Sequence, residues 1–226
     1  MEEELKSEGS CLFCEKMISQ REMGKHLGMH LSEMEKNDGG NGTKNYCHVV
    51  VDAGEMFLHL LVNGTAKMKL IDNFLRDIWL DCCGHLSCFG HKNFKISNKD
   101  IVEDIFVDRI KIYHDYDFGT TTRTYLKGLK NYQLRLKDDI VLLSRNQPLK
   151  LMCVTCKIKP AAFICTTCNY DDYSFFCEEC AKKHEETCAD FAEYGNMPVV
   201  NSPRMGECGY EGGSIDIERD GIYKVK

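Results

Sequence analysis

The clearest hydrophobic pattern lies near the middle of the chain, where an apolar run precedes a helical stripe. Residues 56–62, MFLHLLV, have the apolar density of a buried strand. Residues 69–83 then repeat apolar side chains at i, i+3, i+4, i+7, i+8 and i+11, a spacing that places them on one face of an amphipathic helix. These side chains are Ile71, Phe74, Leu75, Ile78, Trp79 and Cys82. Gly84 is the candidate residue for ending this helix.

Shorter strand patterns follow the predicted helix. Residues 85–89, HLSCF, predict the next strand, and Ile110 and Ile112 alternate with polar residues before a turn that contains Gly119. The segment 132–144 has the pattern of a hairpin, with Asp138 and Asp139 at its turn. Together these patterns predict a small mixed α+β domain in the middle of the chain.

Composition divides the chain into three blocks. Residues 35–45, EKNDGGNGTKN, are rich in Gly and Asn and read as a flexible linker, while cysteine density rises from about residue 148. We therefore expect a zinc finger with its linker in residues 1–44, an α+β domain in 45–147, and a double-zinc module with a C-terminal tail in 148–226.

The first block has the ligand order of a two-Cys/two-His zinc finger. Cys11 and Cys14 form a C-x-x-C pair, and His26 and His30, four apart, follow after a spacer of eleven residues. A C-x-x-C knuckle presents two thiolates on one side of a turn, and two histidines four apart share one helical face. Ser19 is a plausible N-cap for that helix. The middle spacer is one residue shorter than the usual twelve.

Eight further zinc-type ligands crowd into residues 153–188. They comprise three C-x-x-C pairs and then a histidine and a cysteine at helical spacing: Cys153, Cys156, Cys165, Cys168, Cys177, Cys180, His184 and Cys188. Zinc takes four such ligands in a closed structural site, so eight ligands predict two ions. Redox-active C-x-x-C pairs occur singly, which does not fit three pairs in a row. With the N-terminal finger, we expect three zinc ions per chain.

Two pairings of the eight ligands are possible. An interleaved arrangement places Cys153, Cys156, Cys177 and Cys180 on one ion and the other four ligands on the second, as in the cross-brace of B-box and MYND modules, which the stretch resembles. A sequential arrangement would pair the ligands in chain order. Cys208 is either a spare cysteine or a substitute for Cys188. Because B-box and MYND modules chiefly bind proteins, the resemblance implies a protein partner.

Charge and N-terminal composition limit the remaining possibilities. The formal net charge is −6, and no block is strongly basic, which argues against tight binding to a polyanion. Any nucleic-acid binding is expected to be weak. The N-terminus shows no secretory signal, and no apolar run is long enough to span a membrane, so we expect a cytoplasmic protein whose cysteines bind metal rather than form disulfides.

Two segments carry a longer resemblance. IDNFLRDIWLDCCGHLSCF and YDFGTTT are similar to a motif of the plasmid-borne open-reading-frame-three-like domain family, which includes passenger proteins of insertion elements. The similarity extends to MPVVNSPRMGECGYEG, over roughly residues 55–213. It implies an α+β fold and a prokaryotic, mobile-element setting, without a defined activity. Asp117 lies in the YDFG turn, and its role is open.

Catalysis is the weakest of the three functional hypotheses. Cys82, Cys83, His85, Cys88 and His91 lie within ten residues, and a Cys/His pair can act as nucleophile and base. However, Cys82 and Cys83 end an apolar stripe, where cysteine usually behaves as a small core residue, so a core role is favoured, with an extra metal site and catalysis as the alternatives. No complete catalytic motif and no small-molecule substrate can be identified. We therefore predict a non-enzymatic multi-zinc adaptor, with a nucleic-acid-binding accessory protein as the alternative and an enzyme as the third possibility.

Overall fold

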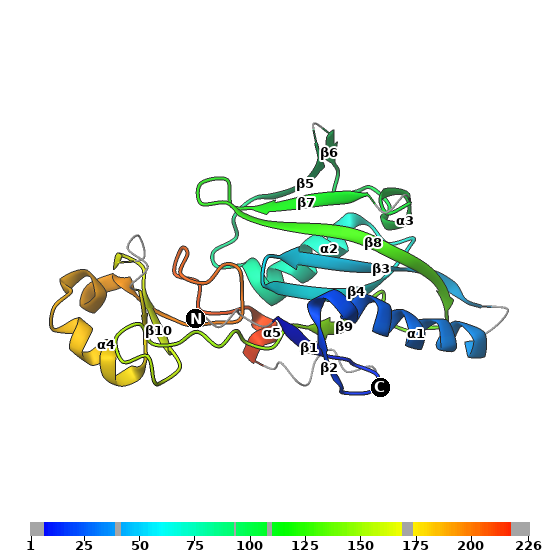
Figure 1. The fold of residues 1–226 in the computed structure, drawn as a ribbon. Coiled ribbons are helices and arrows are strands. Elements are labelled where there is room, and N and C mark those ends of the chain that lie inside the picture. Colours follow the sequence, from blue (N-terminus) through cyan, green and yellow to red (C-terminus); the bar gives the residue numbers. More distant parts are fainter. Residues whose placement is uncertain (1–6, 39–41, 93, 108–109, 169–173, 218–226) are drawn as a thin grey trace.

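A seven-stranded antiparallel sheet forms the centre of the molecule (Figure 1). The computed structural model describes residues 7–38, 42–92, 94–107, 110–168 and 174–217. The strand order across the sheet is β6-β5-β7-β8-β3-β4-β9. The strands are β3 (Lys44–Ala53), β4 (Met56–Asn63), β5 (Ser87–His91), β6 (Phe94–Ile96), β7 (Lys111–Tyr116), β8 (Thr122–Leu134) and β9 (Ile140–Arg145). The α+β class predicted from the sequence is confirmed.

The apolar run becomes β4, and every residue of this strand is buried. It forms a tight hairpin with β3 in which Gly54 has a φ of +73°, a value that glycine adopts without strain. The predicted hairpin between residues 132 and 144 is wrong, although both strands exist. β8 pairs with β3 along most of its length, so β9 pairs with the remaining edge of β4 instead.

The helical stripe packs on one face of the sheet. It forms α2 (Met68–Leu75) and continues as one turn of π-helix, η1 (Arg76–Leu80). Trp79 is fully buried there, in a core that also contains Ile112 and Leu126. A short helix, α3 (Val102–Ile105), contacts strands β3 and β4. The helical segment ends at Leu80, so it stops before Gly84 and before the cysteine pair.

The N-terminal segment covers the opposite face. Strands β1 (Glu8–Ser10) and β2 (Met17–Ser19) form a small hairpin that leads into α1 (Gln20–Asp38). Ser19 precedes the first helical residue, and its hydroxyl donates to the Glu22 carboxylate at 3.0 Å. The buried side of α1 presents Met23, Leu27 and Leu31 to residues of the central strands, so the helix shares its core with the sheet.

The cysteine-rich segment forms a smaller lobe at one end of the molecule (Figure 1). Its three-stranded sheet has the order β11-β10-β12, and within the described residues two short helices accompany it. The elements are β10 (Phe163–Cys165), β11 (Phe175–Phe176), α4 (Glu178–Glu185), η3 (Phe191–Gly195) and β12 (Asn196–Pro198). We call residues 150–200 the C-terminal module, residues 201–217 the tail, and the described residues before 150 the body.

The tail that follows the C-terminal module returns to the body. Ser202 donates its hydroxyl to the Trp79 carbonyl at 2.6 Å, and Asn201 exchanges hydrogen bonds with Asn146. Ile215, in the terminal helix α5 (Ser214–Ile217), joins the core beneath η1. No helix in the described part of the chain has the length and apolar character needed to cross a membrane.

Candidate metal centres

The four ligands predicted in the N-terminal block converge. The knuckle between β1 and β2 supplies Cys11 and Cys14, and one face of α1 supplies His26 and His30. Their four ligand atoms all lie within 4.8 Å of one another, and Cys14 Sγ is 3.2 Å from His26 Nε2. Two thiolates and two imidazoles in this arrangement match the donor set of a structural zinc ion.

The eight ligands of the C-terminal module separate into two groups with interleaved membership. The first group contains Cys153, Cys156, Cys177 and Cys180, and the second contains Cys165, Cys168, His184 and Cys188. Cys156 Sγ lies 3.9 Å from Cys177 Sγ, and Cys168 Sγ lies 4.0 Å from Cys188 Sγ. The grouping is the cross-brace alternative rather than the sequential one.

Helix α4 explains why the groups interleave. Cys177 is its N-cap and Cys180 lies in its first turn, so both face the knuckle at Cys153. His184 lies one turn further along the same helix and faces the other group. Phe176 stacks on the His184 ring at 4.3 Å, which fixes the orientation of the imidazole.

The C-x-x-C knuckle at Cys11 and Cys14 and the one at Cys153 and Cys156 share a backbone geometry. In each, the residue after the second cysteine has a positive φ, 59° at Glu15 and 54° at Lys157. The amide of Glu15 donates to the Cys11 carbonyl at 2.8 Å, and the amide of Lys157 donates to the Cys153 carbonyl at 2.9 Å. Such a turn aims successive N–H groups at the thiolate and so stabilises its charge.

The electrostatics of the first C-terminal group also favour a cation. Burial alone would raise the pKa of Cys153, but backbone N–H groups, that of Cys156 foremost, bring it down to about 6. At Cys180, burial and the neighbouring thiols raise the pKa to about 12. Four clustered thiols therefore cannot all ionise unless a positive charge lies among them, and a divalent ion supplies that charge.

A fourth group lies where the sequence favoured core cysteines and left an extra metal site only as an alternative. Cys82, Cys83 and His85, which follow η1, meet Cys208 of the tail, and their ligand atoms again lie within 4.8 Å of one another. The interpretation of Cys83 as a core residue is therefore wrong, because Cys83 is exposed, whereas Cys82 is partly buried and packs against the core. The helix ends at Leu80, so the cysteine pair lies beyond the apolar stripe. The described residues thus hold four Cys/His groups, where the sequence predicted three.

Only some of the candidate catalytic residues come together. Cys82, Cys83 and His85 meet, and Asp117 Oδ2 lies 3.5 Å from His85 Nε2, whereas Cys88 and His91 lie apart from them. Cys88 and His91 lie on β5, and the His91 ring pairs with the Lys111 carbonyl at 2.9 Å, away from the group at Cys82. Asp117 is buried, with a φ of 63°, and accepts hydrogen bonds from the Gly119 amide at 2.9 Å and from Arg204 at 2.6 Å. The YDFG turn therefore anchors the tail through Arg204, a role that local sequence could not show.

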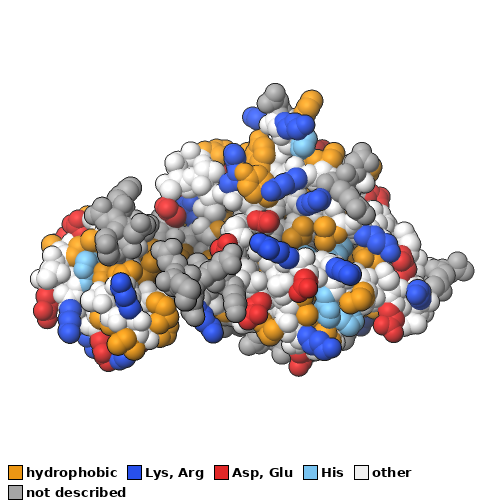
Figure 2. All heavy atoms as spheres, viewed as in Figure 1, with side chains coloured by type: hydrophobic (Ala, Val, Ile, Leu, Met, Phe, Trp, Pro, Cys, Tyr) orange, Lys and Arg blue, Asp and Glu red, His pale blue; other side chains and the backbone are white. Residues whose placement is uncertain are grey.

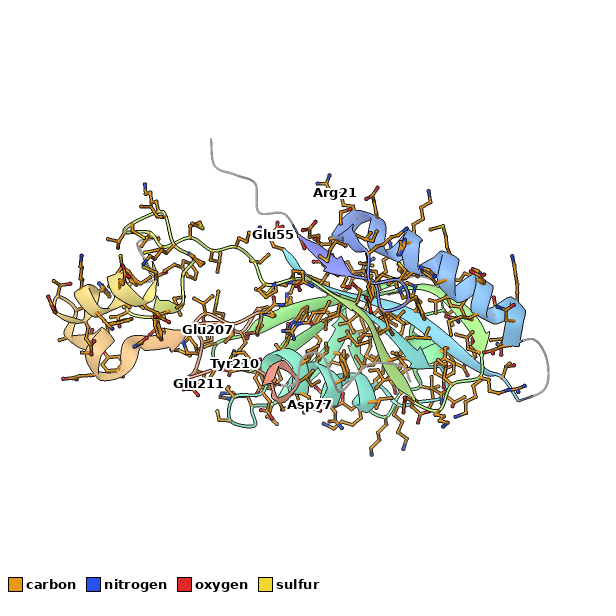
Figure 3. The ribbon with its side chains drawn as sticks, turned by 90° about the horizontal axis from the view of Figure 1, so that it is seen from below. Arg21, Glu55, Asp77, Glu207, Tyr210 and Glu211 are labelled. Carbon is orange, nitrogen blue, oxygen red and sulfur yellow. The ribbon has the colours of Figure 1, made fainter. Side chains whose placement is uncertain are left out.

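A cleft of about 470 Å³ lies where the tail leaves the C-terminal module. Module residues Thr166, Tyr194, Asn196 and Met197 line it together with tail residues Gly206, Glu207, Cys208, Gly209 and Glu211. Figure 3 shows Glu207 and Glu211 close together at this junction. The two charged residues that line the cleft, Glu207 and Glu211, are both acidic.

Comparisons with known proteins add little to this description. No protein-family model matches the sequence. No curated protein matches it either. A crystal structure of a protein of unknown function from Methanosarcina mazei Go1 is similar over 44% of this chain and 67% of that one, at 12% identity and a TM-score of 0.37. The resemblance to the plasmid-borne family therefore stays a prediction that rests on the motifs alone.

Proposed function

We propose that the chain is a non-enzymatic multi-zinc adaptor that binds other proteins through its C-terminal module. The observation that carries this proposal is the donor sets of the three predicted groups. Each has four Cys or His ligands, which fill the tetrahedral shell of zinc and leave no position for a substrate or a water molecule. Zinc in such a shell stabilises a fold and does not activate a nucleophile.

The cleft beside the C-terminal module supplies the contact surface in this proposal. Glu207 and Glu211 give it negative charge, and Tyr194, with 67% of its surface exposed, provides an aromatic side chain at its edge. Exposed tyrosines are common anchors in protein interfaces, and complementary charge selects the partner. A basic peptide segment is the partner that this surface fits. The similarity to the plasmid-borne family suggests a prokaryotic, mobile-element setting for that partner, which gene neighbourhood would test.

A random peptide display library, screened against the zinc-loaded full-length protein, tests the proposal. Peptides rich in Lys and Arg should be enriched, and Glu207→Gln with Glu211→Gln should weaken them about tenfold, equivalent to about 1.4 kcal/mol. Glu185→Gln with Glu186→Gln makes the same charge change outside the cleft and should leave binding unchanged. If no peptide is enriched, or if both pairs of substitutions act alike, this surface does not bind a partner.

A second candidate, binding of single-stranded nucleic acid, is favoured by one face of the sheet. Along β8, Arg123, Tyr125 and Lys127 are exposed on alternate positions, and on β7 Lys111 lies 4.2 Å above the Tyr125 ring. Alternating cations and aromatic rings are typical of surfaces on which bases stack. Figure 2, however, shows acidic side chains among the basic ones on the visible face. Binding at this face should therefore be weak.

Fluorescence anisotropy with labelled oligo-dT and oligo-U separates the two candidates. At physiological salt we expect a dissociation constant of about a micromolar or weaker, which Tyr125→Ala weakens further. Tyr194→Ala, on the C-terminal module, is the matched control and should have no effect. Nanomolar binding that depends on Tyr125 would make nucleic acid the principal ligand and would displace the adaptor proposal.

A further inference from the structure

The group formed by Cys82, Cys83, His85 and Cys208 has the dimensions of a zinc site. His85 Nε2 lies 3.1 Å from Cys83 Sγ and 3.2 Å from Cys208 Sγ, and Cys83 Sγ lies 3.9 Å from the sulfur atoms of both Cys82 and Cys208. Sulfur ligands at about 2.3 Å from zinc in a tetrahedron are about 3.8 Å apart. The separations within the predicted groups, 3.2 to 4.0 Å, span the same range.

The backbone at this group repeats a feature of the predicted knuckles. Gly84 follows Cys83 with a φ of 81°, and Gly209 follows Cys208 with a φ of 66°. Positive values also occur after Cys14 and Cys156, as described above. Cys208 itself has a φ of 48°, a conformation that a residue other than glycine rarely adopts without a tertiary reason. The chain thus turns around these thiols as it does around the predicted zinc ligands.

The positive charge of a buried arginine beside the group complements the negative charge that a zinc ion bound by three thiolates would carry. Three thiols lose their protons when they bind a zinc ion, and a neutral imidazole completes the shell, so the centre carries one excess negative charge. Arg204 is fully buried, and its Nη2 lies 3.8 Å from Cys82 Sγ and 2.6 Å from Asp117 Oδ2. One guanidinium therefore faces both the carboxylate and the thiolate, which reduces the cost of burying each negative charge.

We infer that Cys82, Cys83, His85 and Cys208 bind a fourth zinc ion, which clips the tail to the body. Cys83 and Cys208 are 125 residues apart in sequence, so the ion closes a long loop that contains the whole C-terminal module. A disulfide between them would need its sulfur atoms at about 2.05 Å, well short of the 3.9 Å observed. Three thiols around one imidazole are a donor set for a metal rather than a nucleophile–base pair.

The fourth ion has a structural consequence for the proposed adaptor. The tail leaves the C-terminal module at β12 and reaches the body through Ser202 and Arg204 before it arrives at Cys208. An ion at Cys208 therefore fixes part of the lining of the acidic cleft, because Cys208 lines that cleft beside Glu207. The site goes beyond the three ions of the proposed function and does not depend on the identity of the partner.

Metal analysis of the purified full-length chain tests the inference. We expect four zinc ions in the wild-type protein and three in Cys83→Ser, in Cys208→Ser and in the double variant, because both residues hold the same ion. Both side chains are exposed, so the variants should stay folded. Cys88→Ser, on β5 and outside all four groups, is the matched control and should retain four ions.

Hydrogen exchange supplies a second measurement. Loss of the fourth ion should speed exchange of the amides around Arg204 at least about tenfold, while those of α4 stay unchanged. Three ions in both the wild type and Cys83→Ser would overturn the fourth site and leave the other three intact. A wild-type mass lower by two hydrogens, with a Cys83–Cys208 bond in the peptide map, would also overturn it. Absence of zinc from the whole chain would instead refute the proposed function.

Discussion

Two histidines inside the sheet should make the stability of the protein depend strongly on pH. His48 on β3 and His59 on β4 face each other, with His48 Nε2 2.9 Å from His59 Nδ1. Both side chains are almost completely buried, 1% and 2% exposed, beneath α1. A Cβ on Gly24 of that helix would lie 3.0 Å from Leu129 Cδ1 and 3.4 Å from His59 Cε1, so the helix packs closely on the sheet at this glycine.

Burial disfavours the charged form of each ring. It lowers the pKa of His48 to about 4 and, with the help of the neighbouring His48, lowers that of His59 to about 3. If both rings were protonated, two N–H groups would face each other across the 2.9 Å contact. The folded protein therefore keeps both rings neutral over a range in which the unfolded chain, with a histidine pKa of about 6.5, takes up two protons.

The size of the effect follows from this difference in proton uptake. Both pKa values are depressed on folding, so protons bind the unfolded chain first and stability is lost as the pH falls below about 6.5. At pH 5.5 each unfolded histidine gains about 1.4 kcal/mol from protonation, and at pH 7.5 the gain is negligible. Between these pH values the pair should therefore lower the free energy of unfolding by about 2.7 kcal/mol.

Urea unfolding of the zinc-loaded protein at pH 7.5 and 5.5 measures this loss, with a His48→Gln, His59→Gln variant as the comparison. The substitutions change packing at both pH values, but they remove the titration, so the decisive quantity is the difference in pH dependence. All other histidines and the thiolates are common to both proteins and cancel. If the wild type and the variant lose stability equally between pH 7.5 and 5.5, the rings are not held neutral as argued.

Two further perturbations follow from other parts of the structure. Asp72 is fully buried and accepts hydrogen bonds from His114, Ser87 and Lys69. Asp72→Ala should therefore lower the free energy of unfolding, measured by urea titration, by about 3–5 kcal/mol. A loss below about 1 kcal/mol would show that this network does not stabilise the fold. Zinc chelation should unfold the C-terminal module, because its buried core consists mostly of ligand cysteines. The emission maximum of Trp79, in the sheet core, should stay constant. A red shift of that emission would show that the body does not stay folded without the module.

Local patterns in the sequence predicted the elements with a short-range cause. The buried strand β4, the helix that carries Trp79 and the C-x-x-C knuckles all depend on residues within about a dozen positions of one another. The helical pattern also placed Cys177 and Cys180 at the start of α4, which favoured the interleaved grouping but left sequential pairing open. Such features are determined by backbone geometry and by the preference of zinc for four closely spaced ligands.

The sequence could not predict which distant segments meet. The pairing of β9 with β4 rather than β8 depends on which sheet edge is free, and no local pattern records that. The Gly- and Asn-rich segment before β3 likewise predicted a separate N-terminal block, and the packing of α1 on the sheet was not predicted. That contact depends on the apolar face of α1 and on strand residues that are remote in sequence.

The fourth Cys/His group shows the same division most clearly. The sequence contained all four ligands and the order C-C-x-H, but Cys82 and Cys83 stood at the end of an apolar stripe, which favoured a core role. Only the docked tail brings Cys208 to them, through the Ser202 bond to Trp79 and the Arg204 bond to Asp117. A long loop has no local signal for where it closes, because buried contacts between segments far apart in the chain determine that point.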